Sequence, residues 1–278
     1  METLTTTSET PAVAASQQHW PEYLMEAGEL GCFMLSACVF TVLLEHPASP
    51  VRIDLPDDTL RRVLTGIAMG LTAIAIFHSP WGKRSGAHLN PSVTLTFFSL
   101  GKIEARDAFF YILAQFAGGI AGVGAASLVL GAALGHPAVN YAATMPGPTG
   151  PWIAFGAEFA ISFLMITTVL TFSNSKRLTR WTPVIAGTLV ATYISIEAPL
   201  SGMSMNPART LGSSVWAASF QALWVYFTAP VLGMLLAGRV YVSRRGAQRV
   251  FCAKLHHQNG QRCIFRCNYG ALNKCATT

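Results

Sequence analysis

The chain has 278 residues, of which 51% are hydrophobic and 12% are charged. A soluble domain carries about 25% charged residues, so this chain lacks the charge to cover a water-exposed surface of that size. The composition excludes an ordinary water-soluble enzyme and indicates an integral membrane protein. The net charge of +6 would also suit a nucleic-acid-binding protein. In so apolar a chain we attribute it to membrane topology, and we expect no nucleic-acid partner.

The first 22 residues are rich in Thr, Ser and Ala and contain no Lys or Arg. They lack the basic start and apolar middle of a signal peptide, so we predict a disordered N-terminal tail over residues 1–22. A channel domain over residues 23–243 follows. It holds six apolar stretches, and each is long enough to cross a bilayer core of about 30 Å as a helix. These stretches are 24–44, 61–80, 107–134, 152–172, 181–200 and 221–243.

Two shorter segments, 91–100 and 207–216, are each about half as long as a membrane-spanning helix. Each opens with Asn-Pro. Asn is a favoured N-cap residue, and Pro suits the first helical turn because the N–H that it lacks has no partner there. Both segments are therefore predicted to be half-helices that enter the membrane from opposite sides. Such irregular backbone is tolerated at membrane depth only where protein or a water-filled cavity surrounds it.

The half-helices also reveal an internal repeat. SGAHLNPSVTL (85–95) and SGMSMNPARTL (201–211) share Ser-Gly, Asn-Pro and Thr-Leu at an offset of 116 residues. Two spans precede each copy and one follows, so the repeats, about 24–134 and 152–243, must face opposite sides of the membrane. The fold class is therefore an all-α membrane protein. We expect six transmembrane helices plus two re-entrant half-helices in an inverted repeat.

The basic residues predict the orientation. Six spans place both termini on one side, together with fifteen of the 19 Lys and Arg residues. The other side holds Arg52, Arg61, Arg62 and Arg209. By the positive-inside rule, both termini lie in the cytoplasm.

Where two half-helix N-termini meet, each carries about half a positive charge, so the meeting point repels cations, including a protonated chain of water molecules. If the side-chain oxygens of Asn90 and Asn206 cap their own helices, each amide NH₂ is left to point into a pore. These donors suit the passive passage of a neutral molecule. A secondary transporter would need ionisable groups near the midplane, and an enzyme would need a nucleophile–base pair or a metal cluster. We find neither in the spans.

With these two motifs the chain resembles the major intrinsic protein family of aquaporins and aquaglyceroporins, over about residues 24–243. The resemblance implies a water channel in the plasma membrane, a homotetramer with a pore in each subunit, and no cofactor or metal. The first motif departs from Asn-Pro-Ala, because Ser92 stands in third place and adds a hydroxyl near the constriction. The residues that the two motifs imply for the pore are Asn90, Pro91, Ser92, Asn206, Pro207 and Ala208.

The resemblance also implies an outer selectivity filter. Arg209 belongs to it, and a charge inside a membrane span costs about 2.5 kcal/mol or more. Alignment back from the two motifs adds Met69, Ile194 and Met203, with Tyr193 one step from Ile194. Such a filter lacks the aromatic residue and the histidine of a strict water channel, so glycerol, urea, ammonia or hydrogen peroxide remain alternative solutes. Other positions resemble water-type members and favour water first. They are Thr210, Ser214, Tyr226 and Phe227.

Further residues are expected to support the loops. Glu26 and Glu158 match buried glutamates that brace the re-entrant loops in the family, although Glu29 competes with Glu26. His88 is expected to support its loop through hydrogen bonds. Residues 244–278 form a basic tail, expected to be disordered in the cytoplasm and to lie near lipid headgroups. Its cysteines and histidines lack paired C-x₂-C spacing, so no metal site is predicted. They are Cys252, His256, His257, Cys263, Cys267 and Cys275.

Overall fold

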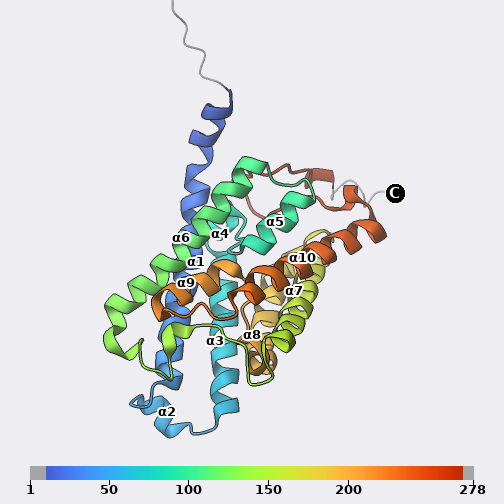
Figure 1. Cartoon of the computed structure of the whole chain (residues 1–278). Helices are drawn as coiled ribbons and strands as arrows, with labels where there is room; N and C mark the ends of the chain where they lie inside the picture. Colours follow the sequence, from blue (N-terminus) through green and yellow to red (C-terminus); the bar gives the residue numbers. More distant parts are fainter. Residues whose placement is uncertain (1–10, 272–278) are drawn as a thin grey trace, which may run out of the picture.

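The computed structural model describes residues 11–271, with side chains from His19 onward, and every regular element within them is a helix. Figure 1 shows a bundle of tilted helices in which two short ones enter from opposite ends. The α-helices are α1 (Pro11–Glu45), α2 (Pro50–Asp54), α3 (Asp58–His78), α4 (Pro80–Ser85), α5 (Pro91–Ser99), α6 (Ala105–Leu130), α7 (Pro151–Ser173), α8 (Thr182–Ser201), α9 (Pro207–Ala217) and α10 (Leu223–Arg245). Short 3₁₀ turns are η1 (Gly131–Ala133), η2 (Asn140–Ala142), η3 (Thr179–Trp181) and η4 (Ala247–Arg249).

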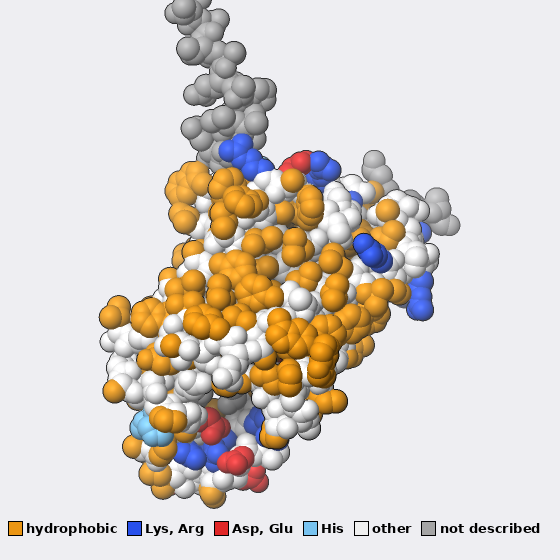
Figure 2. Space-filling view, in the orientation of Figure 1, with side chains coloured by type: hydrophobic (Ala, Val, Ile, Leu, Met, Phe, Trp, Pro, Cys, Tyr) orange, Lys and Arg blue, Asp and Glu red, His pale blue; other side chains and the backbone are white. Residues whose placement is uncertain are grey.

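Six helices are long and apolar enough to cross a membrane, namely α1, α3, α6, α7, α8 and α10. This confirms the predicted number of spans. On the face shown in Figure 2, hydrophobic side chains form a broad band across the middle, with charged side chains gathered toward the two ends. We call the end where α1 begins and α10 finishes the terminal face, and the end that carries α2 and η2 the opposite face (Figure 1).

The start of α1 corrects one expectation. The helix begins at Pro11, so the prediction of a disordered tail over residues 1–22 is wrong for residues 11–22, and residues 1–10 lie outside the described part. Tertiary contacts account for the part of the extension from His19 onward. Glu22 is fully buried and accepts a hydrogen bond from Arg84 Nε at 2.9 Å, while His19 Nδ1 lies 3.0 Å from Asp107 Oδ1. These polar contacts lie beyond the apolar stretch that marked the span.

The helix pairing follows the inverted repeat. The first and third spanning helices of each repeat pack together, as α1 with α6 and α7 with α10, and the second helices, α3 and α8, pack against each other. Each half-helix packs on the last helix of the other repeat, α5 on α10 and α9 on α6. This exchange joins the two halves into one body and confirms the predicted fold class.

Glycines allow the closest helix crossings. A Cβ placed on Gly118 of α6 would lie 2.1 Å from the backbone oxygen of Ala27 in α1, and one on Gly70 of α3 would lie 2.6 Å from the backbone oxygen of Gly187 in α8. Small residues at such crossings let helix backbones approach in a membrane, where lipid offers no hydrophobic drive for association. The scaffold around the half-helices is therefore held by backbone-to-backbone packing.

The end of the chain corrects a second expectation. Residues 246–271, which we call the C-terminal segment, fold against the terminal face rather than forming a disordered tail. Phe251, Leu255 and Phe265 have exposed fractions of 3%, 5% and 7%. Burial of these three apolar side chains outweighs the polar, basic composition that suggested disorder. Residues 272–278, with Cys275, lie outside the described part of the chain.

Candidate pore

The loops that precede α5 and α9 have nearly the same backbone shape. Gly86 and Gly202, at equivalent positions, have φ values of +100° and +77°, and Leu89 and Met205 follow with +51° and +54°. Left-handed conformations are unfavourable for residues with a Cβ, so other contacts must hold these loops in place.

Two buried glutamates supply those contacts. Glu26 accepts hydrogen bonds from the backbone N–H groups of His88 and Leu89, both at 2.8 Å. Glu158 accepts from the corresponding groups of Ser204 and Met205 at 2.6 and 2.7 Å. The two oxygens of one carboxyl group thus serve two neighbouring backbone donors that would otherwise be buried without a partner. Both residues therefore lie where the resemblance placed the loop braces.

Glu29 does not replace Glu26 but adds a second brace. Its carboxylate accepts a hydrogen bond from Ser85 Oγ at 2.8 Å, and it is only 2% exposed. Tyrosine hydroxyls hold the same ends of both loops, because Tyr111 donates to the Ser85 carbonyl at 2.6 Å and Tyr226 to the Ser201 carbonyl at 2.5 Å. Sequence spacing alone could not assign separate roles to Glu26 and Glu29.

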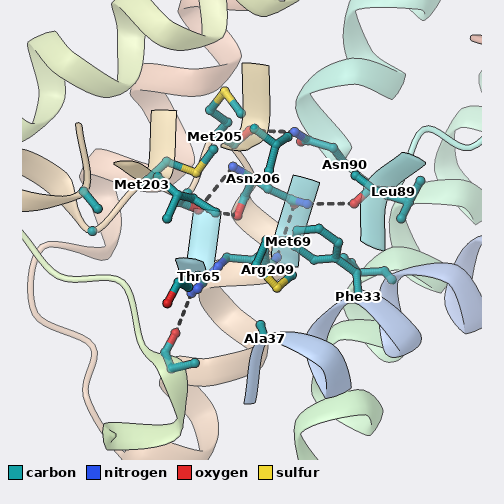
Figure 3. Close-up of a pocket in the computed structure, with 18 of the residues that line it drawn as sticks. Phe33, Ala37, Thr65, Met69, Leu89, Asn90, Met203, Met205, Asn206 and Arg209 are labelled. Atoms are coloured by element: carbon teal, nitrogen blue, oxygen red, sulfur yellow. Dashed lines mark hydrogen bonds between the residues drawn. The ribbon is translucent and has the colours of Figure 1, made fainter. Parts of the chain in front are cut away.

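Asn90 and Asn206 cap their own helices, as predicted. Asn90 Oδ1 accepts from Ser92 N at 2.8 Å, and Asn206 Oδ1 accepts from Ala208 N at 3.0 Å. The amide groups depart from the prediction in one respect. Asn90 Nδ2 donates to the Met205 carbonyl at 2.6 Å, and Asn206 Nδ2 donates to the Leu89 carbonyl at 2.7 Å (Figure 3). Each amide carries two N–H groups, so one remains for a solute.

A cavity of about 600 Å³ runs past these two side chains. On the opposite face it begins between Glu45, Asp58 and Arg62, and toward the terminal face it reaches Phe77 and Leu255. Figure 3 shows Arg209 and Met69 on the side of the paired asparagines nearer the opposite face, with Phe33 and Thr65 beside them.

The predicted filter residues lie together on this cavity. Met69, Ile194, Met203 and Arg209 all line it. Tyr193 is 5% exposed and belongs to the hydrophobic core instead, which supports the gap-free assignment of Ile194.

Other lining residues were missed. Phe33 and Ala37 from α1 and Thr65 from α3 also line the cavity. They lie outside both motifs. The only sequence signal that points to Thr65 is its spacing of one helical turn from Met69.

Arg209 is held by the loop that contains η2. Its Nη1 donates to the Ala142 carbonyl at 2.8 Å. The next residue, Thr210, joins a hydroxyl network, with its Oγ1 2.8 Å from Thr144 Oγ1 and 2.5 Å from Ser204 Oγ. The Thr210 hydroxyl therefore joins α9 to the loop that contains Thr144 and to the loop that precedes α9.

Four motif residues lie behind the pore wall. Pro91, Ser92, Pro207 and Ala208 are buried but do not line the cavity. Ser92 Oγ has no hydrogen-bond partner in the described chain. The expected extra hydroxyl therefore lies within the protein rather than at the constriction, and that expectation is wrong.

His88 links its loop to the C-terminal segment. Its Nε2 donates to the Ala253 carbonyl at 2.9 Å, so its Nδ1 accepts from the Thr94 hydroxyl at 3.0 Å. Thr94 Oγ1 in turn accepts from Gln115 Nε2 at 3.1 Å. His88 also contributes to the cavity lining. His88 therefore both supports its loop and lines the pore.

Comparison with known proteins agrees with this geometry. The chain is 32% identical over 244 residues to aquaporin NIP2-2 of Zea mays, which covers 84% of this chain and 80% of that protein. It is 33% identical over 228 residues to aquaporin NIP2-3 of Zea mays, with 81% and 73% covered. The crystal structure of the aquaglyceroporin of Plasmodium falciparum superposes with a TM-score of 0.65 at 18% identity, over 80% of this chain and 95% of that one, and so shares the fold. The model of the family described as major intrinsic protein matches residues 17–241, and this chain belongs to that family.

Proposed function

We propose that this chain is a passive channel for water and small uncharged solutes, rather than an enzyme or a secondary transporter. The observation that carries the proposal is the meeting of two capped half-helices, where Asn90 and Asn206 line one cavity. Two amide donors can hold the oxygen of a passing molecule, while the positive ends of α5 and α9 repel cations and protonated water.

We assign the outer filter to Arg209, Met69, Ile194 and Met203, with Phe33 and Thr65 beside them. The guanidinium group offers hydrogen-bond donors on one side, while thioether, aliphatic and aromatic groups face the rest of the path. A solute that passes must present an acceptor to the arginine and tolerate an apolar wall. Water meets that requirement, and so does a small polyol or amide.

A solute facilitator is the second candidate, and the character of Ile194 and Met69 favours it. Neither side chain can form hydrogen bonds that replace those a solute leaves behind in water. The filter therefore does not favour water over glycerol, urea, ammonia or hydrogen peroxide. The relatives named as aquaporins and the aquaglyceroporin with the same fold are consistent with either candidate.

The placement in the cell is also proposed. The terminal face carries most of the basic residues, which supports cytoplasmic termini by the positive-inside rule. Exposed apolar side chains such as Leu128, Val129 and Trp152 (exposed fractions 89%, 75% and 75%) are available to face lipid or neighbouring copies. We assign the protein to the plasma membrane as a homotetramer, with a pore in each subunit.

Stopped-flow light scattering on proteoliposomes tests the function. An inward osmotic gradient of an impermeant sugar should shrink the vesicles faster than empty ones. If the protein is a solute facilitator, a gradient of glycerol or urea should give shrinkage followed by accelerated reswelling. Osmotic permeability no higher than that of empty vesicles, in protein shown to be folded and inserted, contradicts the channel.

A further inference from the structure

The C-terminal segment brings three thiols and one imidazole to a single point. One donor atom from each of Cys252, His257, Cys263 and Cys267 lies within 4.8 Å of all the others. Cys252 Sγ and Cys263 Sγ are 3.5 Å apart, and His257 Nε2 is 3.0 Å from Cys267 Sγ. All three cysteines are free thiols.

These separations suit a tetrahedral zinc site. Zinc binds thiolate sulfur at about 2.3 Å and imidazole nitrogen at about 2.0–2.1 Å, so its ligand atoms lie about 3.5–3.8 Å from one another. The separations in the cluster, 3.0 and 3.5 Å for two pairs and no more than 4.8 Å for any pair, bracket that range. Three sulfurs and one nitrogen also form a donor set that structural zinc sites use. The spacing along the chain, C-x₄-H-x₅-C-x₃-C, is irregular, so the sequence alone predicts no metal site there.

The surroundings of the cluster are built for thiolates. The backbone N–H groups of Lys254 and Tyr269 point at Cys252 Sγ and Cys267 Sγ, at 3.5 and 3.4 Å. The His257 ring stacks on Tyr269 with centroids 4.1 Å apart and 16° between the planes, which fixes its orientation. Contacts of this kind hold metal ligands in place before the ion arrives.

Lys254 places a buried cationic side chain next to this cluster. It is only 2% exposed, and both hydrogen bonds from its Nζ go to carbonyl oxygens, those of Gln261 and Arg262, at 3.2 and 2.6 Å. A buried ammonium group is costly unless an opposite charge lies nearby. Zn²⁺ bound by three thiolates carries a net charge of −1, which would balance the lysine.

The residues of the C-terminal segment that contact the pore lie between these four ligands in the sequence. Between Cys252 and His257, the Ala253 carbonyl accepts from His88 and Leu255 lines the end of the cavity. The Leu255 N–H donates to the Gly86 carbonyl at 3.2 Å. Between His257 and Cys267, the Phe265 ring stacks on His88 with centroids 5.3 Å apart and planes 9° apart. An ion that ties both stretches together would hold them on the pore mouth.

We propose that Cys252, His257, Cys263 and Cys267 form a Zn²⁺ site, and that the bound ion holds the C-terminal segment across the pore mouth on the terminal face. The three thiols release their protons to solvent as the ion binds. With the ion, Leu255 and Phe265 stay packed at the mouth. Without it, this stretch loses its central cross-link and moves away, so permeability rises. The effect on flux rests on the proposed channel function, whereas the metal site does not.

Metal analysis of the full-length protein tests the site directly. Protein purified under reducing conditions and equilibrated with buffered Zn²⁺ should hold one zinc ion per chain by elemental analysis. Co²⁺ in its place should give the absorption of a tetrahedral thiolate complex. Cys263→Ser should weaken zinc binding by at least about 100-fold, more than the loss of a contact outside the ligand set. Cys263→His, which restores a ligand, should recover the ion.

Two matched controls locate the site. His256→Ala changes the neighbouring histidine and should retain zinc, while His257→Ala should lose it. Cys32→Ser changes an exposed cysteine on α1, outside the cluster, and should also retain zinc. Equal zinc content in wild type and Cys263→Ser overturns the proposal. So does a Cys252–Cys263 disulfide without bound metal in the reduced preparation.

Water flux tests the consequence for the mouth. Proteoliposomes of the zinc-loaded wild type should be less permeable than the same vesicles after chelation, while Cys263→Ser should be permeable and unaffected by the chelator. Equal flux in loaded and stripped wild type refutes closure of the mouth, although zinc content would still establish the site. Absence of flux in every sample would contradict the proposed channel and leave the metal measurement intact.

Discussion

The side-chain amide of Asn90 donates a hydrogen bond to the carbonyl oxygen of Met205, 2.6 Å away, and so joins the start of α5 to the loop that precedes α9. The equivalent bond in the second repeat runs from the Asn206 amide to the Leu89 carbonyl oxygen at 2.7 Å. The two half-helices are therefore fastened to each other where they meet. The asparagines combine three tasks, namely capping their own helices, locking the opposite loop and offering a remaining N–H to the pore.

Asn90→Asp should destabilise this junction. The carboxylate keeps the cap but faces the Met205 carbonyl with an acceptor, so a buried carbonyl loses its donor at a cost of about 1–3 kcal/mol. Water permeability should fall, and the melting temperature in detergent should drop. By the symmetry of the two bonds, Asn206→Asp should show a similar loss. If Asn90→Asp melts like wild type, the bond to Met205 does not support the junction.

Glu158→Gln should weaken the second loop. The carboxylate accepts from Ser204 N, Met205 N and Ser201 Oγ, and an amide NH₂ in its place would face donors. We expect a loss of about 2–4 kcal/mol, measured by thermal unfolding in detergent. Glu104→Gln is the matched control, because its ion pair with Arg266 is exposed and solvent screens it. Equal decreases in melting temperature in the two variants would show that Glu158 does not stabilise the loop more than an exposed glutamate does.

Ile194→His should narrow the filter and add a polar group. Flux of glycerol or urea, where the wild type conducts it, should fall, while water flux is retained. Ile196→His is the control, since it makes the same substitution on the same helix at a side chain that is 68% exposed and outside the cavity. The two variants are compared by reswelling of proteoliposomes in a solute gradient. Unchanged solute flux in Ile194→His would place this residue outside the filter.

Ser92→Ala should leave flux unchanged and preserve or raise stability. Its hydroxyl is buried and finds no partner among the described residues, so removal relieves a desolvation cost of about 1–3 kcal/mol. The readouts are the melting temperature and osmotic permeability. A loss of water flux in this variant, with folding intact, would show that the hydroxyl acts on the pore after all.

Gly118→Ala should destabilise the crossing of α1 and α6. The added methyl would lie 2.1 Å from the Ala27 backbone oxygen, so the helices must separate, at a cost of about 1–3 kcal/mol. Gly156→Ala makes the same change on α7, where a Cβ meets nothing within 4 Å, and should be neutral or slightly stabilising. Unfolding in detergent compares the two. Similar melting temperatures would show that the crossing adapts without cost.

Most of the fold could be predicted from local sequence patterns. The apolar stretches, Asn-Pro motifs and 116-residue offset predicted six spans and two half-helices, because hydrophobic length and helix capping are properties of contiguous residues. The resemblance added Arg209, Ile194 and Met69, which all lie on the cavity. Phe33 and Thr65 were missed because their place on the pore wall depends on how α1 and α3 rotate against their neighbours.

The sequence by itself determined the membrane class, the inverted repeat and the paired asparagines, since each is written in a short run of residues. Only the tertiary structure decided the separate tasks of Glu26 and Glu29, the burial of the Ser92 hydroxyl and the course of residues 246–271. Those outcomes depend on contacts between residues far apart in the chain. Cys252 and Cys267 illustrate the difference, because their irregular spacing suggested a loose tail, while packing against the channel brings their sulfurs to one point.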